Sequence, residues 1–255
     1  MKNELNVVWM YPDILNLHGD RGNLMALKRI GEMMDITMNL TKVERFGDAI
    51  PLDTADILFF NVGELKVMPA ILEALNKVKE QLISFVEAGK TVILIGASGS
   101  LFAKKTIRKA EEFEGLGVLD MELTERNTIY GDDIMYTLEE NGMEIAGCQI
   151  KMFDTHLLSD IRLGTLYYGS GNDGYDKQTE GAKYKNVTFT NALGPVLVKN
   201  PWFAQHILLT ALQNKGLTPE KTLTDADFEL ELNSLKSIKE FIDKKGEKDV
   251  SAAFN

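Results

Sequence analysis

The stretch TVILIGASGSLFA, residues 91–103, decides the fold of this chain. Its first five residues, TVILI, are apolar after Thr91 and mostly β-branched, which is typical of a buried strand. At Gly96 the run changes to small residues, which predicts a turn and then a helix beginning near residue 99. In α/β enzymes the first residue of such a turn can hold up a nucleophile. Here that residue is glycine, so no side-chain atom is available to attack a substrate.

The flanking sequence predicts an α/β protein with a mainly parallel sheet covered by helices on both faces. Runs rich in β-branched or aromatic residues predict strands at 5–11, 36–43, 56–61, 91–95, 146–152 and 186–190. Helical patterns at 21–34 and 69–88 alternate with the early strands. From about residue 113, glycines punctuate short strands, which indicates hairpins added to that sheet.

The last third of the chain predicts a loop and two helices. Residues 168–181 are rich in turn-forming types and predict a long surface loop, and a helix follows at 200–215. We expect one domain over residues 1–215 and a charged helical tail over 216–255. The tail has one apolar face, which we expect to dock on its own domain rather than on a partner, formed by Phe228, Leu232, Leu235, Ile238 and Phe241.

Composition narrows the function. A formal charge of -10 without a clustered Lys/Arg stripe argues against nucleic acid as a partner. Cys148 is the only cysteine, so an internal disulfide cannot form. The N-terminus does not resemble a signal peptide, and no apolar run reaches the roughly 18 residues of a membrane helix. We therefore expect a cytoplasmic protein without membrane insertion.

An ordered series of motifs identifies a family resemblance. YPDILNLHGDRGNLMALK (11–28), EFEGLGVLDMELTE (112–125), YGSGNDG (168–174) and EGAKYKNVTFTNALGPVLVKNP (180–201) resemble the glutaminase subunit of bacterial lipid II isoglutaminyl synthase. That subunit is part of the class I glutamine amidotransferase-like group, which includes cobyric acid synthase (the CobB/CobQ-like proteins). The resemblance covers roughly the first 215 residues. The resemblance implies a flavodoxin-like amidotransferase fold. It also implies a protein that hydrolyses glutamine and passes the ammonia to a Mur-ligase-type partner.

The same alignment implies that the catalytic groups are missing. The chemistry needs a thiolate, a histidine base and backbone amides for the oxyanion. The family thiol lies in a pattern like ICGGYQ, and the gap-free match through EAGKTVILI puts Gly96 there. The family histidine lies in a pattern like TYLHGPLLPKNP, and TNALGPVLVKNP puts Leu193 in its place.

Other pocket positions change as well. Of the family's glycine-rich turn, expected to supply an oxyanion amide, only Gly63 remains within NVGELK. Ser100 stands where the family has glutamine, and in GCQIKMFDT (147–155) Lys151 replaces a histidine. We expect the altered pocket to be lined by Gly63, Ser98, Ser100, Gln149 and Lys151.

Two residues, Ser98 and Cys148, could replace the missing nucleophile, but each also has a structural interpretation. Ser98 could act if a base touched it, but no base is visible in the sequence, and Ser98 and Ser100 suit capping of the predicted helix better. Cys148 could pair with His156 only through a hairpin, and a lone cysteine in an apolar strand is more often a core residue.

The remaining histidines predict no metal site and no cofactor. His18 lies in NLHGDRGN near Asp13, Asp20 and Arg21. A structural role for Asp20 and Arg21, in loop pairing or partner contact, is favoured over metal ligation. His206 is interpreted as a surface or half-buried helix residue. Residues 168–174 match neither a P-loop nor a dinucleotide-binding motif.

Three functions remain open at this stage. The first is a catalytically silent amidotransferase-like protein that serves as a scaffold or regulator for a Mur-ligase-like subunit. The second is an active glutaminase with an atypical nucleophile such as Ser98. The third is a sensor whose emptied pocket between Gly63, Gly96 and Leu193 binds an apolar or amino-acid ligand, such as glutamine, without chemistry.

Overall fold

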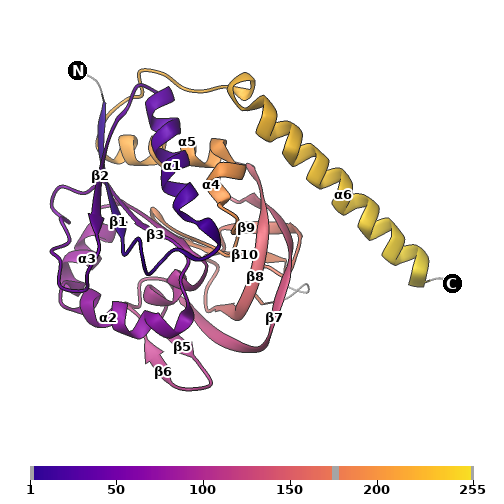
Figure 1. Ribbon diagram of the computed structural model, residues 1–255, viewed down its shortest axis with the longest axis horizontal. Helices are drawn as coiled ribbons and strands as arrows, with labels where there is room; N and C mark the ends of the chain where they lie inside the picture. The colour runs from indigo at the N-terminus through magenta and orange to yellow at the C-terminus, as the bar shows by residue number, and fades with distance from the viewer. Residues whose placement is uncertain (1–2, 174–177, 254–255) are drawn as a thin grey trace.

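The computed structural model describes residues 3–173 and 178–253, and it contains two sheets (Figure 1). The first sheet has the order β11-β12-β4-β3-β1-β2, in which all pairs except β11 with β12 are parallel. Its strands are β1 (Glu4–Met10), β2 (Thr37–Val43), β3 (Ile57–Phe60), β4 (Thr91–Ile95), β11 (Ala182–Tyr184) and β12 (Val187–Thr190). The predicted parallel sheet is confirmed.

Alternate residues of the parallel strands feed two cores. Ile93 and Ile95 belong to the core under α1 (Arg21–Met33) and α5 (Pro201–Asn214). Val92 and Leu94 belong to the core under α2 (Met68–Asn76) and α3 (Lys79–Glu87). Because successive side chains of a strand point to opposite faces, a fully apolar strand such as β4 requires helices on both sides.

The predicted helix over 69–88 is two helices in the structure. Backbone bonds from Lys77 to Ala74 and from Val78 to Leu75 close the end of α2, and α3 begins at Lys79. The apolar spacing continues across this break because both helices face the same core. Hydrophobic periodicity alone therefore could not locate it.

The helix predicted after Gly96 is also different. Residues Gly96–Leu101 form a short 3-10 helix, η3, and the chain then enters β5 (Lys105–Ile107) rather than an α-helix. The small residues GASGS fit this tight segment; Gly99 for example lies against Phe189, where a β-carbon would come within 2.5 Å of the ring.

The predicted hairpin strands form a second sheet instead of extending the first. Its order is β10-β9-β7-β5-β6, with β8 also paired to β7. The strands are β5, β6 (Glu112–Glu114), β7 (Met121–Leu138), β8 (Glu144–Leu157), β9 (Gly164–Tyr168) and β10 (Thr179–Glu180). The long β7 pairs with β5, β8 and β9, so these strands make their backbone hydrogen bonds within the second sheet.

The C-terminal helix α6 (Glu229–Ala253) follows a 3-10 turn, η4 (Asp225–Phe228), and runs along the outside of the second sheet (Figure 1). Ile242 packs in a small core with Met135 and Ala146. Lys239 pairs with Glu144, and Lys245 reaches Asp132 at 3.1 Å. Phe228 is buried, and Leu232, Leu235 and Ile238 pack against the chain's own cores. Phe241 is 60% exposed, so the predicted apolar face docks only in part. Whether residue 215 is a domain boundary stays a prediction.

An ion-pair cluster joins α5 to the β7–β8 hairpin. His206 Nε2 lies 2.8 Å from Glu140 Oε1, and Lys183 also pairs with Glu140. The imidazole of His206 and then the ammonium of Lys183 lower the pKa of Glu140 to about 2. His206 is half-buried on its helix, as its sequence position indicated.

Glu140→Gln should therefore destabilise the protein by about 1 kcal/mol at pH 7, a value reduced because the carboxylate is partly exposed to solvent. A carboxylate whose pKa falls on folding stabilises above its unfolded pKa of 4.5 and loses this effect as pH drops towards 2. Urea unfolding of both proteins from pH 7 to pH 2.5 is expected to converge at the acid end. A difference that stayed constant with pH would contradict an ionic origin.

Candidate functional site

The candidate site lies where the parallel strands end. Phe60 of β3 pairs with Leu94, and Ile95 of β4 pairs with Thr190 of β12, so the segments that follow these strands meet at one edge. Strand β8 closes this edge from the second sheet, because Cys148 and Leu193 exchange backbone hydrogen bonds of 3.2 and 2.8 Å. Ligands of open α/β sheets bind at such carboxyl ends.

Gly96 has a left-handed backbone and no room for a side chain. Its φ is +57°, in the left-handed region that favours glycine. A β-carbon there would lie 2.7 Å from Val62 Cγ2 and 3.3 Å from Leu193 Cδ2. Leu193 is buried in the core that Val62 shares, whereas Leu101 packs in the other core. Apolar side chains thus occupy the space in front of the turn.

The remaining cavity is very small. Its volume is about 10 Å³, room for about one water molecule, against roughly 300 Å³ or more for sites that hold small organic ligands. Gln149 and Lys151 line it together with Gly96 and Leu193, and His18 and Asn191 contribute as well. Gly63, Ser98 and Ser100 are not among its lining residues.

The two serines do not cap a helix, which corrects the sequence prediction. Ser98 Oγ donates to the carbonyl oxygens of Ile95 (3.0 Å) and Phe60 (3.2 Å), and Ser100 Oγ donates to that of Ala97 (2.7 Å). Capping would require these oxygens to accept backbone N–H groups instead. Both hydroxyls are buried and serve the turn itself.

Cys148 and His156 do not form a dyad. Both lie on β8, eight residues apart, which corresponds to about 26 Å at ~3.3 Å per residue. Burial raises the pKa of the Cys148 thiol. His156 Nδ1 lies 3.4 Å from a carboxylate oxygen of Asp173. The cysteine is therefore a protonated, half-buried strand residue.

The segment 13–21 is held by an ion pair and a hydrogen bond to the turn that follows β3. Arg21 pairs with the exposed Asp13, and Asp20 Oδ2 accepts the backbone N–H of Val62 at 3.2 Å. Across residues 3–173 and 178–253, no group of three potential ligands could hold a metal ion. Asp20 is fully buried, and burial, partly opposed by the Val62 bond, raises its pKa to about 6.

Asp20→Asn should stabilise the protein at neutral pH. A carboxyl whose pKa rises on folding, here from 3.8 to about 6, weakens the fold as pH increases through that interval, by up to about 3 kcal/mol. An asparagine oxygen can still accept the Val62 N–H. We expect the variant to gain about 1–2 kcal/mol at pH 7 and nothing below pH 4 in urea unfolding. A variant less stable than wild type at both pH values would refute this.

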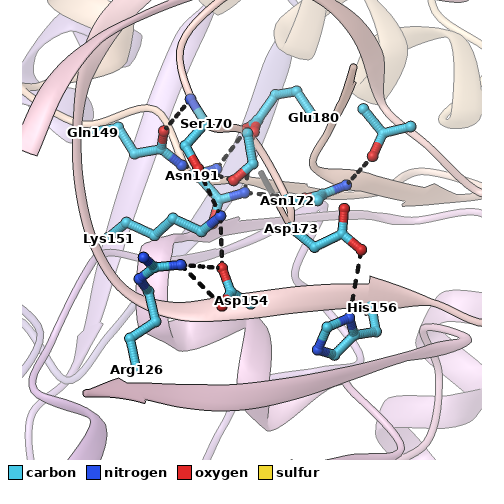
Figure 2. A network of polar contacts seen from close by, with 12 residues as sticks. Arg126, Gln149, Lys151, Asp154, His156, Ser170, Asn172, Asp173, Glu180 and Asn191 are labelled. Carbon is cyan, nitrogen blue, oxygen red and sulfur yellow. Dashed lines mark hydrogen bonds and ion pairs between the residues drawn. The ribbon is translucent and has the colours of Figure 1, made fainter. Parts of the chain in front are cut away.

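A buried polar network surrounds Lys151 (Figure 2). Lys151 is 3% exposed, and its Nζ lies 2.9 Å from Ser170 Oγ and 2.8 Å from Asp154 Oδ1. Arg126 Nη1 lies 2.8 and 2.9 Å from the two oxygens of Asp154. Burial lowers the pKa of Lys151 against the opposing effect of Asp154. Lys151 and Arg126 outweigh burial to lower the pKa of Asp154.

A second part of the network centres on a fully buried carboxylate. Glu180 accepts hydrogen bonds from the Asn191 backbone (2.7 Å), the Asn191 amide (3.0 Å) and Thr190 Oγ1 (2.8 Å). Burial raises the pKa of Glu180. Asn191 also donates to Asn172 Oδ1 at 3.1 Å. These bonds fix the strand end that leads to Leu193.

The segment 169–172 is buried, which corrects its prediction as a surface loop. Gln149 Oε1 accepts the Ser170 N–H (3.2 Å), and its Nε2 donates to the Gly171 carbonyl (2.8 Å). Residues 174–177 of the predicted loop lie outside the described residues. Sequence reasoning missed Arg126, Asp154 and Ser170; the signal was the polar residues at alternating positions 149 and 151 of a strand with one buried face.

Ser170 and Lys151 are as close as a serine–lysine catalytic pair, but their chemistry is different. Such a pair needs a neutral amine to take the hydroxyl proton. Here Lys151 donates to Ser170, and Asp154 stabilises the charged ammonium. Ser170 therefore has a proton donor beside it rather than a base.

Comparison with known proteins agrees with the motifs and the fold. No protein-family model matches the chain. It is 29% identical over 233 residues to the lipid II isoglutaminyl synthase (glutamine-hydrolyzing) subunit GatD of Staphylococcus aureus, covering 89% of this chain and 93% of that relative. It is 28% identical over 217 residues to the Streptococcus pneumoniae GatD subunit, covering 83% and 82%.

A solved structure described as a glutamine amidotransferase matches with a TM-score of 0.55 and 16% identity, over 80% of this chain and 98% of that one. The curated homologues confirm the resemblance to the glutaminase subunits, and the solved structure confirms the amidotransferase fold. Within the described residues, no helix has both the length and the apolar character needed to cross a bilayer.

Proposed function

We propose that this chain is a non-catalytic amidotransferase-like subunit that acts as a scaffold or regulator beside a Mur-ligase-type partner. Its curated relatives are named as subunits of the glutamine-hydrolysing lipid II isoglutaminyl synthase, so we place the chain in the amidation of a peptidoglycan precursor. The observation that carries the proposal is the filled space at Gly96, where Val62 and Leu193 occupy the positions a nucleophile and its base would need.

The oxyanion side of the site supports the same conclusion. Glutamine hydrolysis through a thioester needs backbone N–H groups free to bind the developing oxyanion. The turn expected to supply one of them is held by Asp20, whose carboxylate oxygen already accepts the Val62 N–H. A carboxylate at that point would also repel an oxyanion.

The two alternative functions receive less support. Ser98 is buried and its hydroxyl donates to backbone carbonyl oxygens, so no base accepts its proton. A small-ligand sensor would need a larger cavity than one of about 10 Å³ beside Gly96.

Ammonia release from glutamine tests the proposal, measured with the chain alone and with a candidate Mur-ligase-type protein from the same organism. We expect no release above the protein-free rate at any ratio, together with co-purification of the two proteins. Ser98→Ala and Ser170→Ala serve as matched variants. Release that one of them abolishes would show an active enzyme with an atypical nucleophile, and an absence of co-purification would count against the scaffold.

A further inference from the structure

The cavity beside Gly96 is bordered by an ammonium group that belongs to the protein. Lys151 reaches it from β8 with an almost fully buried side chain. Its Nζ is held by the carboxylate of Asp154 and the hydroxyl of Ser170, at 2.8 and 2.9 Å (Figure 2). A carboxylate and a hydroxyl at these distances are two hydrogen-bond acceptors that suit a primary ammonium group.

The same strand face holds the segment 169–172 against the site. Gln149 and Lys151 are two residues apart on β8, so their side chains share a face. Gln149 binds the N–H of Ser170 and the carbonyl of Gly171, while Lys151 binds the hydroxyl of Ser170. Asn172 N–H then bonds to Thr179 O at 2.9 Å, and Thr155 N–H bonds to Asn172 O at 2.8 Å.

We propose that Lys151 is an internal ligand: its ammonium occupies a primary-amine site formed by Asp154 and Ser170, and so holds the segment 169–172 against β8. This inference is independent of the proposed function, because a held segment would be found in an inactive or an active protein.

Chemical complementation tests the inference. Lys151→Ala removes Cγ, Cδ, Cε and Nζ, which together have the size of n-propylammonium. We expect hydrogen exchange at the Ser170 and Asn172 amides to accelerate about tenfold or more in this variant. Added n-propylammonium should restore protection in a saturable manner. Tetramethylammonium, which has no N–H donor, and sodium chloride should not restore it.

Two further variants complete the test. In Lys151→Met the side chain fills the site without a charge, so n-propylammonium should have no effect on it or on wild type. Ser170→Ala should accelerate exchange at residues 170–172 while β4 amides stay protected, and it covers the case in which Lys151→Ala does not fold. Unchanged exchange in these variants, or equal restoration by tetramethylammonium, would overturn the inference. Hydrogen exchange tests this inference, whereas ammonia release tests the proposed function. Either proposal can therefore fail while the other stands.

Discussion

Asp154→Ala is expected to lower the free energy of unfolding by about 3 kcal/mol, whereas Lys151→Met should change it by less than about 1.5 kcal/mol. Removing Asp154 leaves the buried ammonium of Lys151 with only the Ser170 hydroxyl and with Arg126 nearby. Removing the charge of Lys151 leaves Asp154 paired with Arg126 at 2.8 Å. The two substitutions therefore differ, because only Asp154→Ala leaves a buried charge without an ionic partner.

The pH dependence provides a second readout. A lysine whose pKa falls on folding destabilises the fold as pH drops below its unfolded value near 10.5, so the loss in Asp154→Ala should shrink as pH rises towards 10. Asp13→Ala is the control, since that exposed ion pair with Arg21 should be worth less than about 1 kcal/mol. Equal losses for Asp154→Ala and Lys151→Met in urea unfolding would show that the ammonium is not the buried charge that matters.

Gly96→Ala should destabilise the chain by about 2–4 kcal/mol, because its β-carbon meets Val62 Cγ2 at 2.7 Å and its φ is positive. Gly117→Ala is a matched control: its φ is +77°, but nothing lies within 4 Å of its β-carbon. It should lose only the backbone part, about 1 kcal/mol. The difference between the two losses of unfolding free energy measures the steric cost of a β-carbon at Gly96.

A double-mutant cycle with Val62→Ala identifies the side chain that fills the space beside Gly96. We expect Gly96→Ala to be about 1–2 kcal/mol less damaging in the Val62→Ala background, since the contacting methyl group is gone. Restoring the family residues through Gly96→Cys and Leu193→His should not restore ammonia release while Val62 stays. Thermal and urea unfolding give the stabilities. Additive effects would mean that Val62 does not occupy the nucleophile's space.

Much of the fold follows from local patterns, while part of the site does not. The run 91–95, β-branched or apolar at every position, predicts a buried strand, and the change at Gly96 places the turn correctly. That Gly96 and Leu193 stand at the family's thiol and histidine positions is a prediction from aligned motifs. The position of Val62 could not be predicted in this way, because whether a valine fills a neighbouring space depends on how β3 and β4 are placed side by side.

The Lys151 network was beyond sequence reasoning for a similar reason. Arg126, Asp154 and Ser170 come from different strands and a loop, and their pairing depends on the register of β7 with β8, which shifts between Glu125 and Tyr130. The break between α2 and α3 was hidden because the apolar period continues through it. Ser98 and Ser100 were assigned to capping because sequence cannot show whether a hydroxyl donates or accepts.

Covalent trapping tests the absence of a nucleophile most directly. The chain, alone and with the proposed Mur-ligase-type partner, is incubated with an electrophilic glutamine analogue, and its intact mass is measured beside that of an active GatD subunit. We predict an unmodified mass for this chain under conditions that label the active subunit fully. A single stoichiometric adduct mapped to Ser98, Cys148, Lys151 or Ser170 would contradict the account.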